Sequence, residues 1–109
     1  EPEHEWCYYS AKAELAQQQG DYQGVVSLGN EAIELGFSPE DPTEWLVFIE
    51  GFARIGDLQT AQNLSNTILE EDSRIRRGVC TVWEQIQAKS QVRSAEEIEA
   101  IILSLSCNP

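Results

Sequence analysis

The stretch that decides the fold is residues 45–68, WLVFIEGFARIGDLQTAQNLSNTI, in which two apolar segments are joined by Gly56-Asp57. On each side of this pair, apolar side chains recur three, four and seven residues apart, which is the spacing of an amphipathic helix. Glycine can end a helix because it tolerates a left-handed backbone, and Asp57 can cap the helix that follows. The stretch therefore predicts two helices joined by a tight turn.

The same pattern recurs along the chain. Gly20 and Ser90 occupy the position of Gly56, at spacings of 36 and 34 residues. Self-similarity of this length is typical of helical hairpins that bury their apolar faces against neighbouring hairpins. In this register the following residues are equivalent: Tyr9, Trp45 and Val79; Ala16, Phe52 and Ile86; Val25, Ala61 and Ala95; Leu28, Leu64 and Ile98; Ala32, Ile68 and Ile102.

We therefore expect an all-α fold, an α-α superhelix of three helix-turn-helix repeats. It would form a single domain over residues 1–109, with repeats near 5–38, 41–72 and 74–107. The six helices are expected near residues 3–19, 22–35, 43–55, 58–71, 74–89 and 95–106. Two capping boxes support the third and sixth starts, namely Asp41 with Glu44 and Ser94 with Glu97.

The composition limits the classes of partner. The chain has 109 residues, of which 41% are hydrophobic, and a net charge of -12. The charge is -7 over residues 1–40, -6 over 41–72 and +1 over 73–109. An acidic surface repels phosphate backbones and anionic lipid, so nucleic acid and direct membrane insertion are not expected. A basic protein or peptide is the better electrostatic partner, although acidity also simply promotes solubility.

The ends and the cysteines suggest where the chain resides. It starts at Glu1 and contains no methionine, so we expect a processed product or a fragment of a longer protein. Cys7, Cys80 and Cys107 are odd in number and far apart, which predicts free buried thiols in a reducing compartment. Cytoplasmic localisation is expected, and tethering to a membrane through a parent protein stays open.

Two stretches carry a resemblance to a known family. Trp45 and Phe52, followed by Gly56-Asp57-Leu58, Ala61 and Ile68, resemble a tetratricopeptide repeat. Gln19-Gly20-Asp21-Tyr22 with Ala32-Ile33-Glu34-Leu35 is similar to the same motif. The chain departs from it at Lys12, where the family prefers Leu, at Ile49 and Trp83, where it prefers a small residue, and at Gly29 inside a helix.

A fainter resemblance points to a different setting. Trp6-Cys7-Tyr8-Tyr9 and Glu44-Trp45-Leu46 resemble the soluble C-terminal segments of large bacterial membrane-embedded glycosyltransferase-like proteins. This resemblance implies a structural or oligomerisation appendage of a membrane-bound enzyme, with no catalytic residue in the chain itself. Trp6 and Tyr8 would then form an apolar patch at the open end of the stack.

The repeat resemblance implies a concave wall made by the first helix of each hairpin. Glu14, Glu50 and Glu84 share one register position and would form an acidic row along it. Other residues expected on this wall are Ser10, Gln17, Leu46, Arg54 and Gln87. We expect a protein-interaction scaffold that binds basic or amphipathic segments. The alternative is that Glu simply favours a solvated helical face.

Three arginines, Arg74, Arg76 and Arg77, open the fifth predicted helix. Cations at a helix N-terminus oppose its dipole, so a compensating contact is expected. Pairing with Glu70, Glu71 and Asp72 is the favoured interpretation. The alternative is an anion site, or a docking patch for another acidic copy of the chain, which leaves a homo-oligomer open.

No set of residues indicates catalysis. His4 and Cys7 have a spacing found in metal sites, but a structural zinc needs four ligands. One histidine without a converging nucleophile and carboxylate does not make a catalytic triad. We therefore expect no enzyme activity, no metal and no cofactor.

Overall fold

The computed structural model describes residues 5–89 and 92–107, and within them it contains six α-helices and no strand. The predicted all-α class is therefore confirmed. The helices are α1 (Trp6–Gln18), α2 (Tyr22–Glu34), α3 (Leu46–Arg54), α4 (Leu58–Glu71), α5 (Arg76–Ala88) and α6 (Val92–Ser104). Two 3-10 turns, η2 (Pro42–Trp45) and η3 (Ser73–Ile75), precede α3 and α5.

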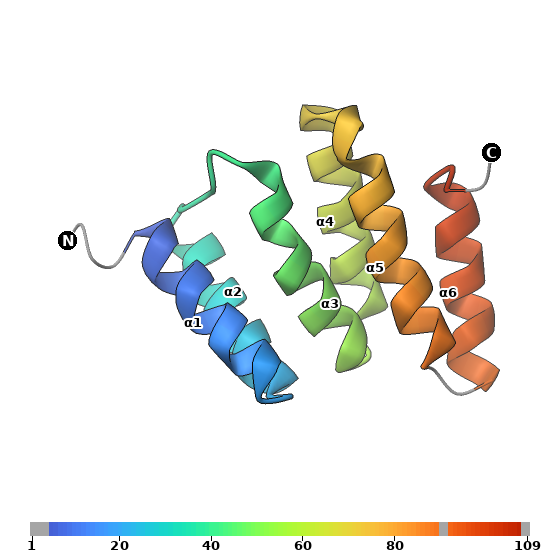
Figure 1. Ribbon diagram of the computed structural model, residues 1–109, viewed down its shortest axis with the longest axis horizontal. Coiled ribbons are helices and arrows are strands. Elements are labelled where there is room, and N and C mark those ends of the chain that lie inside the picture. Colours follow the sequence, from blue (N-terminus) through green and yellow to red (C-terminus); the bar gives the residue numbers. More distant parts are fainter. Residues whose placement is uncertain (1–4, 90–91, 108–109) are drawn as a thin grey trace.

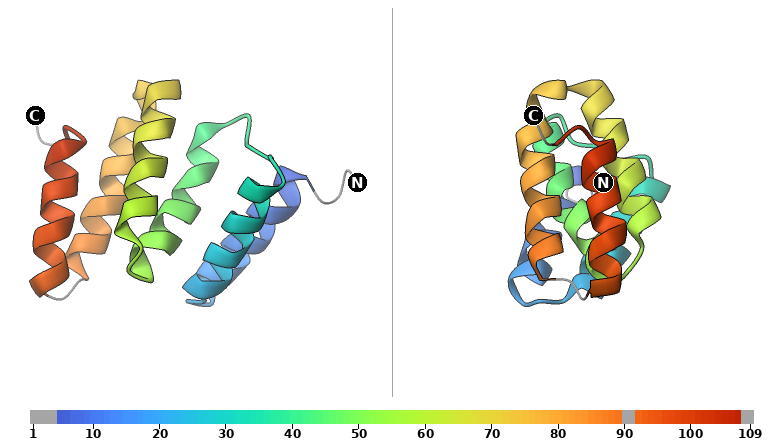
Figure 2. Two further views of the ribbon diagram at one scale, coloured as in Figure 1. Left: turned by 180° about the vertical axis from the view of Figure 1, so that it is seen from behind. Right: turned by 90° about the vertical axis from the view of Figure 1, so that its right-hand side faces the viewer.

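The helices form three antiparallel hairpins, which lie side by side in chain order along the longest dimension of the molecule (Figure 1). The extents are 42 × 28 × 20 Å. Seen from the end, α1, α3 and α5 form one layer, and α2, α4 and α6 form the other (Figure 2). Each new hairpin contacts the one before it through its first helix, as α3 does with α2 and α5 does with α3.

The first two hairpin turns use the residues that the sequence singles out. Gly20 and Gly56 adopt φ angles of 75° and 98°, which L side chains rarely adopt. Asp21 accepts a hydrogen bond from the Gly24 amide at 2.9 Å, and Asp57 accepts one from the Thr60 amide at 3.2 Å. Both predicted helix ends and both predicted caps are therefore confirmed.

The start of the third helix is only partly as predicted. Asp41 caps the Thr43 amide at 3.0 Å, but the chain first makes the 3-10 turn η2. Glu44 does not turn back to close a capping box. Its carboxylate accepts a hydrogen bond from the Trp6 indole N–H at 2.6 Å, because α1 packs close to this turn.

The last helix begins earlier than predicted. α6 starts at Val92, two residues before Ser94, so Ser94 lies inside the helix and cannot be its cap. The apolar face of α6 is as the pattern indicates, since Ile98, Ile101 and Ile102 are all buried.

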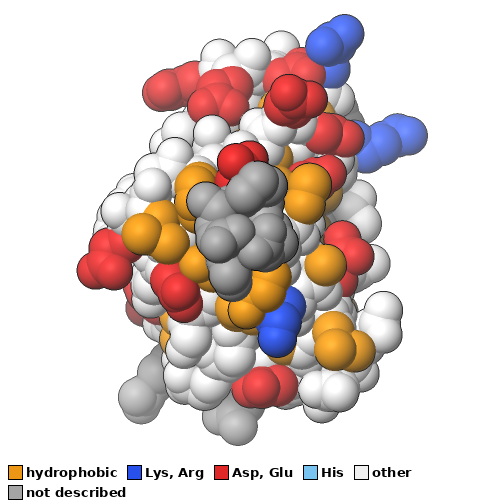
Figure 3. Space-filling model, turned by 90° about the vertical axis from the view of Figure 1, so that its left-hand side faces the viewer, with side chains coloured by type: hydrophobic (Ala, Val, Ile, Leu, Met, Phe, Trp, Pro, Cys, Tyr) orange, Lys and Arg blue, Asp and Glu red, His pale blue; other side chains and the backbone are white. Residues whose placement is uncertain are grey.

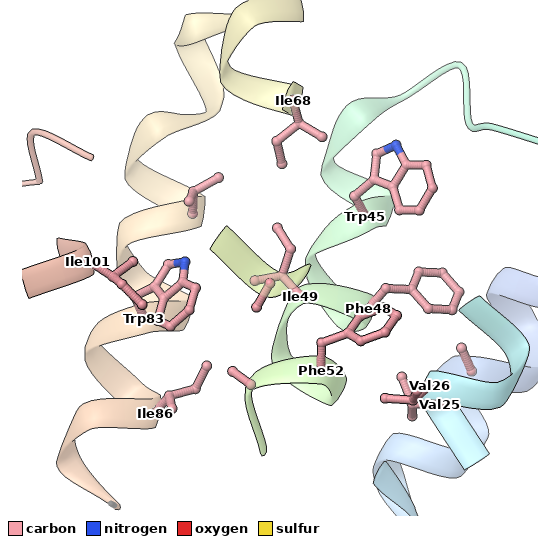
Figure 4. Packing of buried hydrophobic residues seen from close by; sticks show 14 of the residues in the cluster. Val25, Val26, Trp45, Phe48, Ile49, Phe52, Ile68, Trp83, Ile86 and Ile101 are labelled. Carbon is pink, nitrogen blue, oxygen red and sulfur yellow. The ribbon is translucent and has the colours of Figure 1, made fainter. Parts of the chain in front are cut away.

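Two glycines allow α2 and α3 to approach each other closely. A Cβ atom on Gly29 of α2 would lie 2.8 Å from Cδ1 of Phe48, and one on Gly51 of α3 would lie 2.5 Å from Cγ1 of Val25. Each helix therefore inserts a large side chain into the gap left by a glycine on the other. Phe48 from α3 and Val25 from α2 both belong to the buried hydrophobic core (Figure 4). The unusual glycine within α2 is thus explained by packing.

A large side chain also replaces the expected small one in the third hairpin. Trp83 of α5 is buried, and its indole N–H donates to Ser65 Oγ of α4 at 2.9 Å. Ser65 in turn donates to the Ala61 carbonyl at 2.9 Å. These two hydrogen bonds satisfy the indole N–H of Trp83 and the hydroxyl group of Ser65 within the core.

The cysteines contradict the prediction of free buried thiols. Cys80 of α5 and Cys107 form a disulfide, with Cα atoms 5.5 Å apart, and the remaining Cys7 is exposed. The pairing arises because the antiparallel hairpin returns the end of α6 to the beginning of α5. Arg76 reinforces this closure by donating to the Leu105 carbonyl at 3.2 Å.

We predict that Gly51→Ala lowers the free energy of unfolding by about 1–3 kcal/mol, because the added methyl group collides with Val25. This loss should appear although alanine is intrinsically the better helix former by about 1 kcal/mol. Urea denaturation followed by circular dichroism measures it. Gly78→Ala is the control, since its Cβ would meet only the end of the flexible Leu46 side chain at 3.3 Å. Equal effects of both substitutions would contradict the close approach.

We predict that replacing Cys80 and Cys107 together by serine lowers the free energy of unfolding by up to about 3.5 kcal/mol. This is the loop entropy of a cross-link between residues 27 apart in sequence. Cys7→Ser is the matched control and should leave stability unchanged. Thiol titration of the unfolded, unreduced wild-type protein should find one free thiol per chain, and three would contradict the disulfide.

Candidate functional site

A hollow of about 360 Å³ lies between α1, α3 and α5 on the layer of first helices. Three carboxylates, those of Glu14, Glu44 and Glu50, surround apolar side chains of Leu46 and Val82. The other lining residues are Gln17, Gln18, Thr43, Val47 and Gln85. The lining therefore combines negative charge, amide groups and an apolar surface, and it includes no lysine or arginine.

Glu50 lines this hollow and already has two partners. Its carboxylate accepts hydrogen bonds from Arg54, the shorter at 2.8 Å, and from the Gln17 amide at 2.6 Å. The guanidinium of Arg54 also lies 5.4 Å from the centre of the Tyr22 ring. These contacts hold Glu50 in place and compensate part of its charge, which leaves exposed Glu14 as the less encumbered carboxylate.

Glu44 also lines the hollow, and it is held by Trp6, which belongs to a cluster of aromatic rings. Trp6 packs against Trp45 and Phe48, with ring centres 4.7 and 5.4 Å apart, and donates its indole N–H to Glu44. Trp6 is only 6% exposed, so the predicted apolar patch containing it is wrong. Its side chain turns inward because α3 supplies both an aromatic surface and a hydrogen-bond acceptor.

The structure brings together some of the residues predicted for the groove and separates others. Glu14, Gln17, Leu46 and Glu50 line the hollow. Four predicted residues are not among its lining: Ser10 is buried, Arg54 lies behind Glu50, Glu84 is exposed elsewhere on α5, and Gln87 donates to Glu99 of α6.

Sequence reasoning missed Thr43, Glu44, Val47, Val82 and Gln85 in this lining. On α5, Gln85 lines the hollow and Glu84 does not. Residues at the same position of the repeat therefore do not all face the hollow. Thr43 and Glu44 enter through the turn η2, which the sequence did not distinguish from the helix. Val82 shares its register position with Phe48, which packs on the preceding hairpin and does not line the hollow, so the register alone did not place Val82 there.

The three arginines do not converge on one site. Arg74 donates to both carboxylate oxygens of Asp72, at 2.9 and 3.1 Å, which is the kind of pairing favoured from the sequence. The hydrogen bonds from the Arg74 side chain, followed by that from its backbone, lower the pKa of Asp72. Arg76 contacts the end of α6, where a cation is favourable to that helix's dipole, and Arg77 is exposed.

Elsewhere in the described ranges, no group of three or more His, Cys, Asp and Glu side chains has the arrangement of a metal site. His4, half of the pair considered from the sequence, lies outside the described residues. Tyr9 donates its hydroxyl to Glu31 at 2.9 Å, which joins α1 to α2. Burial, followed by this hydrogen bond, raises the pKa of Tyr9.

Comparisons of the chain with known protein families, curated proteins and solved structures gave no match. Of the helices in the described ranges, none has both the length and the apolar character needed to span a bilayer.

Proposed function

We propose that the chain is a tetratricopeptide-like interaction module and that the hollow between α1, α3 and α5 binds a protein segment with basic and aliphatic side chains. The observation that carries this proposal is the pairing of Glu14, Glu44 and Glu50 with an apolar surface in one cavity. An aliphatic side chain would bury its surface on Leu46 and Val82. A lysine or arginine beside it would meet the carboxylates in charge-assisted hydrogen bonds.

The tetratricopeptide-like assignment rests on the hairpin geometry together with the motif. The Gly-Asp turns end and cap helices in two successive repeats, and each first helix packs on the preceding hairpin. Stacked hairpins of this kind expose a continuous wall of first helices, which suits the binding of an extended or helical segment.

A binding role suits this lining better than catalysis. The lining includes no serine, cysteine, histidine or lysine that could serve as a nucleophile or a general base near neutral pH. Two of its three carboxylates already accept hydrogen bonds within the protein, that of Glu50 from Arg54 and that of Glu44 from Trp6. We therefore propose a scaffold and not an enzyme.

The disulfide changes the compartment proposed for this module. Cytoplasmic localisation was expected from the odd number of cysteines. A Cys80–Cys107 disulfide persists in oxidising compartments and is rare where thiols are kept reduced. We therefore propose that the module works in an oxidising environment, where the cross-link retains the end of α6.

We predict that a peptide of alternating leucine and lysine binds the hollow, whereas its leucine–glutamate counterpart does not. In a titration followed by ¹H–¹⁵N NMR, amide shifts should cluster at Leu46, Val47, Glu50 and Val82. Glu14→Lys should weaken the binding about tenfold or more, because it replaces a charge-assisted hydrogen bond by repulsion.

The matched control is Glu34→Lys, which makes the same change of charge at an exposed position of α2. It should change the affinity only slightly, through the net charge of the chain. If both variants bind equally well, or if the shifts map to another surface, the hollow is not the binding site.

A further inference from the structure

The contacts that join one repeat to the next have counterparts at both open ends of the stack. Within the molecule, Phe48 of α3 packs on Gly29 of α2. In the repeat register, Lys12 takes the position of Phe48 in the first hairpin, and Glu99 takes that of Gly29 in the last. Phe48 and Gly29 are buried, whereas Lys12 and Glu99 are exposed.

The second contact between α2 and α3 also has register equivalents at the two ends of the stack. Val25 packs on Gly51 inside the molecule. The register equivalents are Ala95 at the C-terminal end and Leu15 at the N-terminal end. Leu15 is a large hydrophobic side chain that is 55% exposed. Ala95 is half-buried.

One pair of side chains at the two ends, Lys12 and Glu99, is opposite in charge. Lys12 forms no ion pair with any described carboxylate, and its ammonium lies 5.4 Å from the centre of the Tyr8 ring. Glu99 accepts a hydrogen bond from Gln87 and has no cationic partner among the described residues. At the N-terminal end, hydrophobic side chains lie around the centre of the face, and acidic side chains lie both among them and toward its edge (Figure 3).

We propose that the N-terminal end of one copy docks on the C-terminal end of a second copy, so that the stack of hairpins continues from molecule to molecule. Lys12 of one copy then faces Glu99 of the next, and Leu15 packs on Ala95. The contact is head-to-tail and leaves an open end on each side, so it extends without closing. One helical face per partner is a small interface, so the association is weak and depends on concentration.

This contact explains the departure of Lys12 from the family pattern. A leucine at this position would leave an exposed apolar side chain whenever the chain is alone. A lysine is soluble in the free molecule and gains a carboxylate partner in the assembled one. The proposal is independent of peptide binding in the hollow, because it uses the ends of the stack.

A charge-swap experiment tests the proposal. Lys12→Glu places two acidic groups at every junction between its own copies, and Glu99→Lys places two basic groups there. In an equimolar mixture, the two variants can alternate. One junction then joins the two substituted positions, which carry opposite charges, and the next joins the unchanged Lys12 and Glu99. Sedimentation velocity follows the mean mass from micromolar to millimolar protein, in a Cys7→Ser background that prevents cross-linking through the exposed thiol.

The wild-type charges should give a sedimentation coefficient that rises with concentration, and each variant alone should shift that rise to at least about tenfold higher concentration. The mixture should restore it, and Glu34→Lys should behave as the wild type. Circular dichroism confirms that each variant is folded. A wild type that stays monomeric at millimolar concentration overturns the proposal, as does a mixture that associates no better than its separate components.

Discussion

The close approach of α2 and α3 is the constraint on which the rest of the structure depends. Phe48 lies against Gly29, and Val25 lies against Gly51, so neither helix can carry a side chain at its own contact point. Such mutual insertion fixes both the separation and the rotation of the second hairpin relative to the first, because interiors are packed to high density. The hollow follows from that placement: with α3 seated on α2, Gln17 reaches Glu50 and Trp6 reaches Glu44, each at 2.6 Å.

The third hairpin is attached by a different solution to the same problem. Gly78 of α5 lies near Leu46, and Trp83 fills the space between α4 and α5 while Ser65 satisfies its indole N–H. The disulfide then joins α5 to the segment after α6. Small domains with limited cores often depend on such covalent links. Side-chain hydrogen bonds thus accompany the packing at both junctions, and the disulfide adds a covalent closure within the last hairpin.

The sequence predicted the helices and turns well because these depend on neighbouring residues. Gly56-Asp57 ends one helix and caps the next through contacts only a few residues apart. For Gly29, the sequence indicated only the low helix propensity of glycine. It did not indicate the packing against Phe48, because Phe48 belongs to another hairpin. The disulfide was missed for the same reason: nothing within a few residues of Cys80 or Cys107 indicates that the hairpin returns one to the other.

The candidate site was predicted in part because a repeat register fixes the position of a residue along a helix more reliably than its direction. Glu14 and Glu50 reach the hollow, whereas on α5 it is Gln85 that does so. The most direct test of the account is a set of nuclear Overhauser contacts across the α2–α3 junction. We predict contacts from the Phe48 ring protons to the Gly29 Hα protons, and from the Val25 methyl groups to the Gly51 Hα protons. A Phe48 ring that contacts neither Gly29 nor its neighbours on α2 would contradict the stacking of the hairpins and the hollow that depends on it.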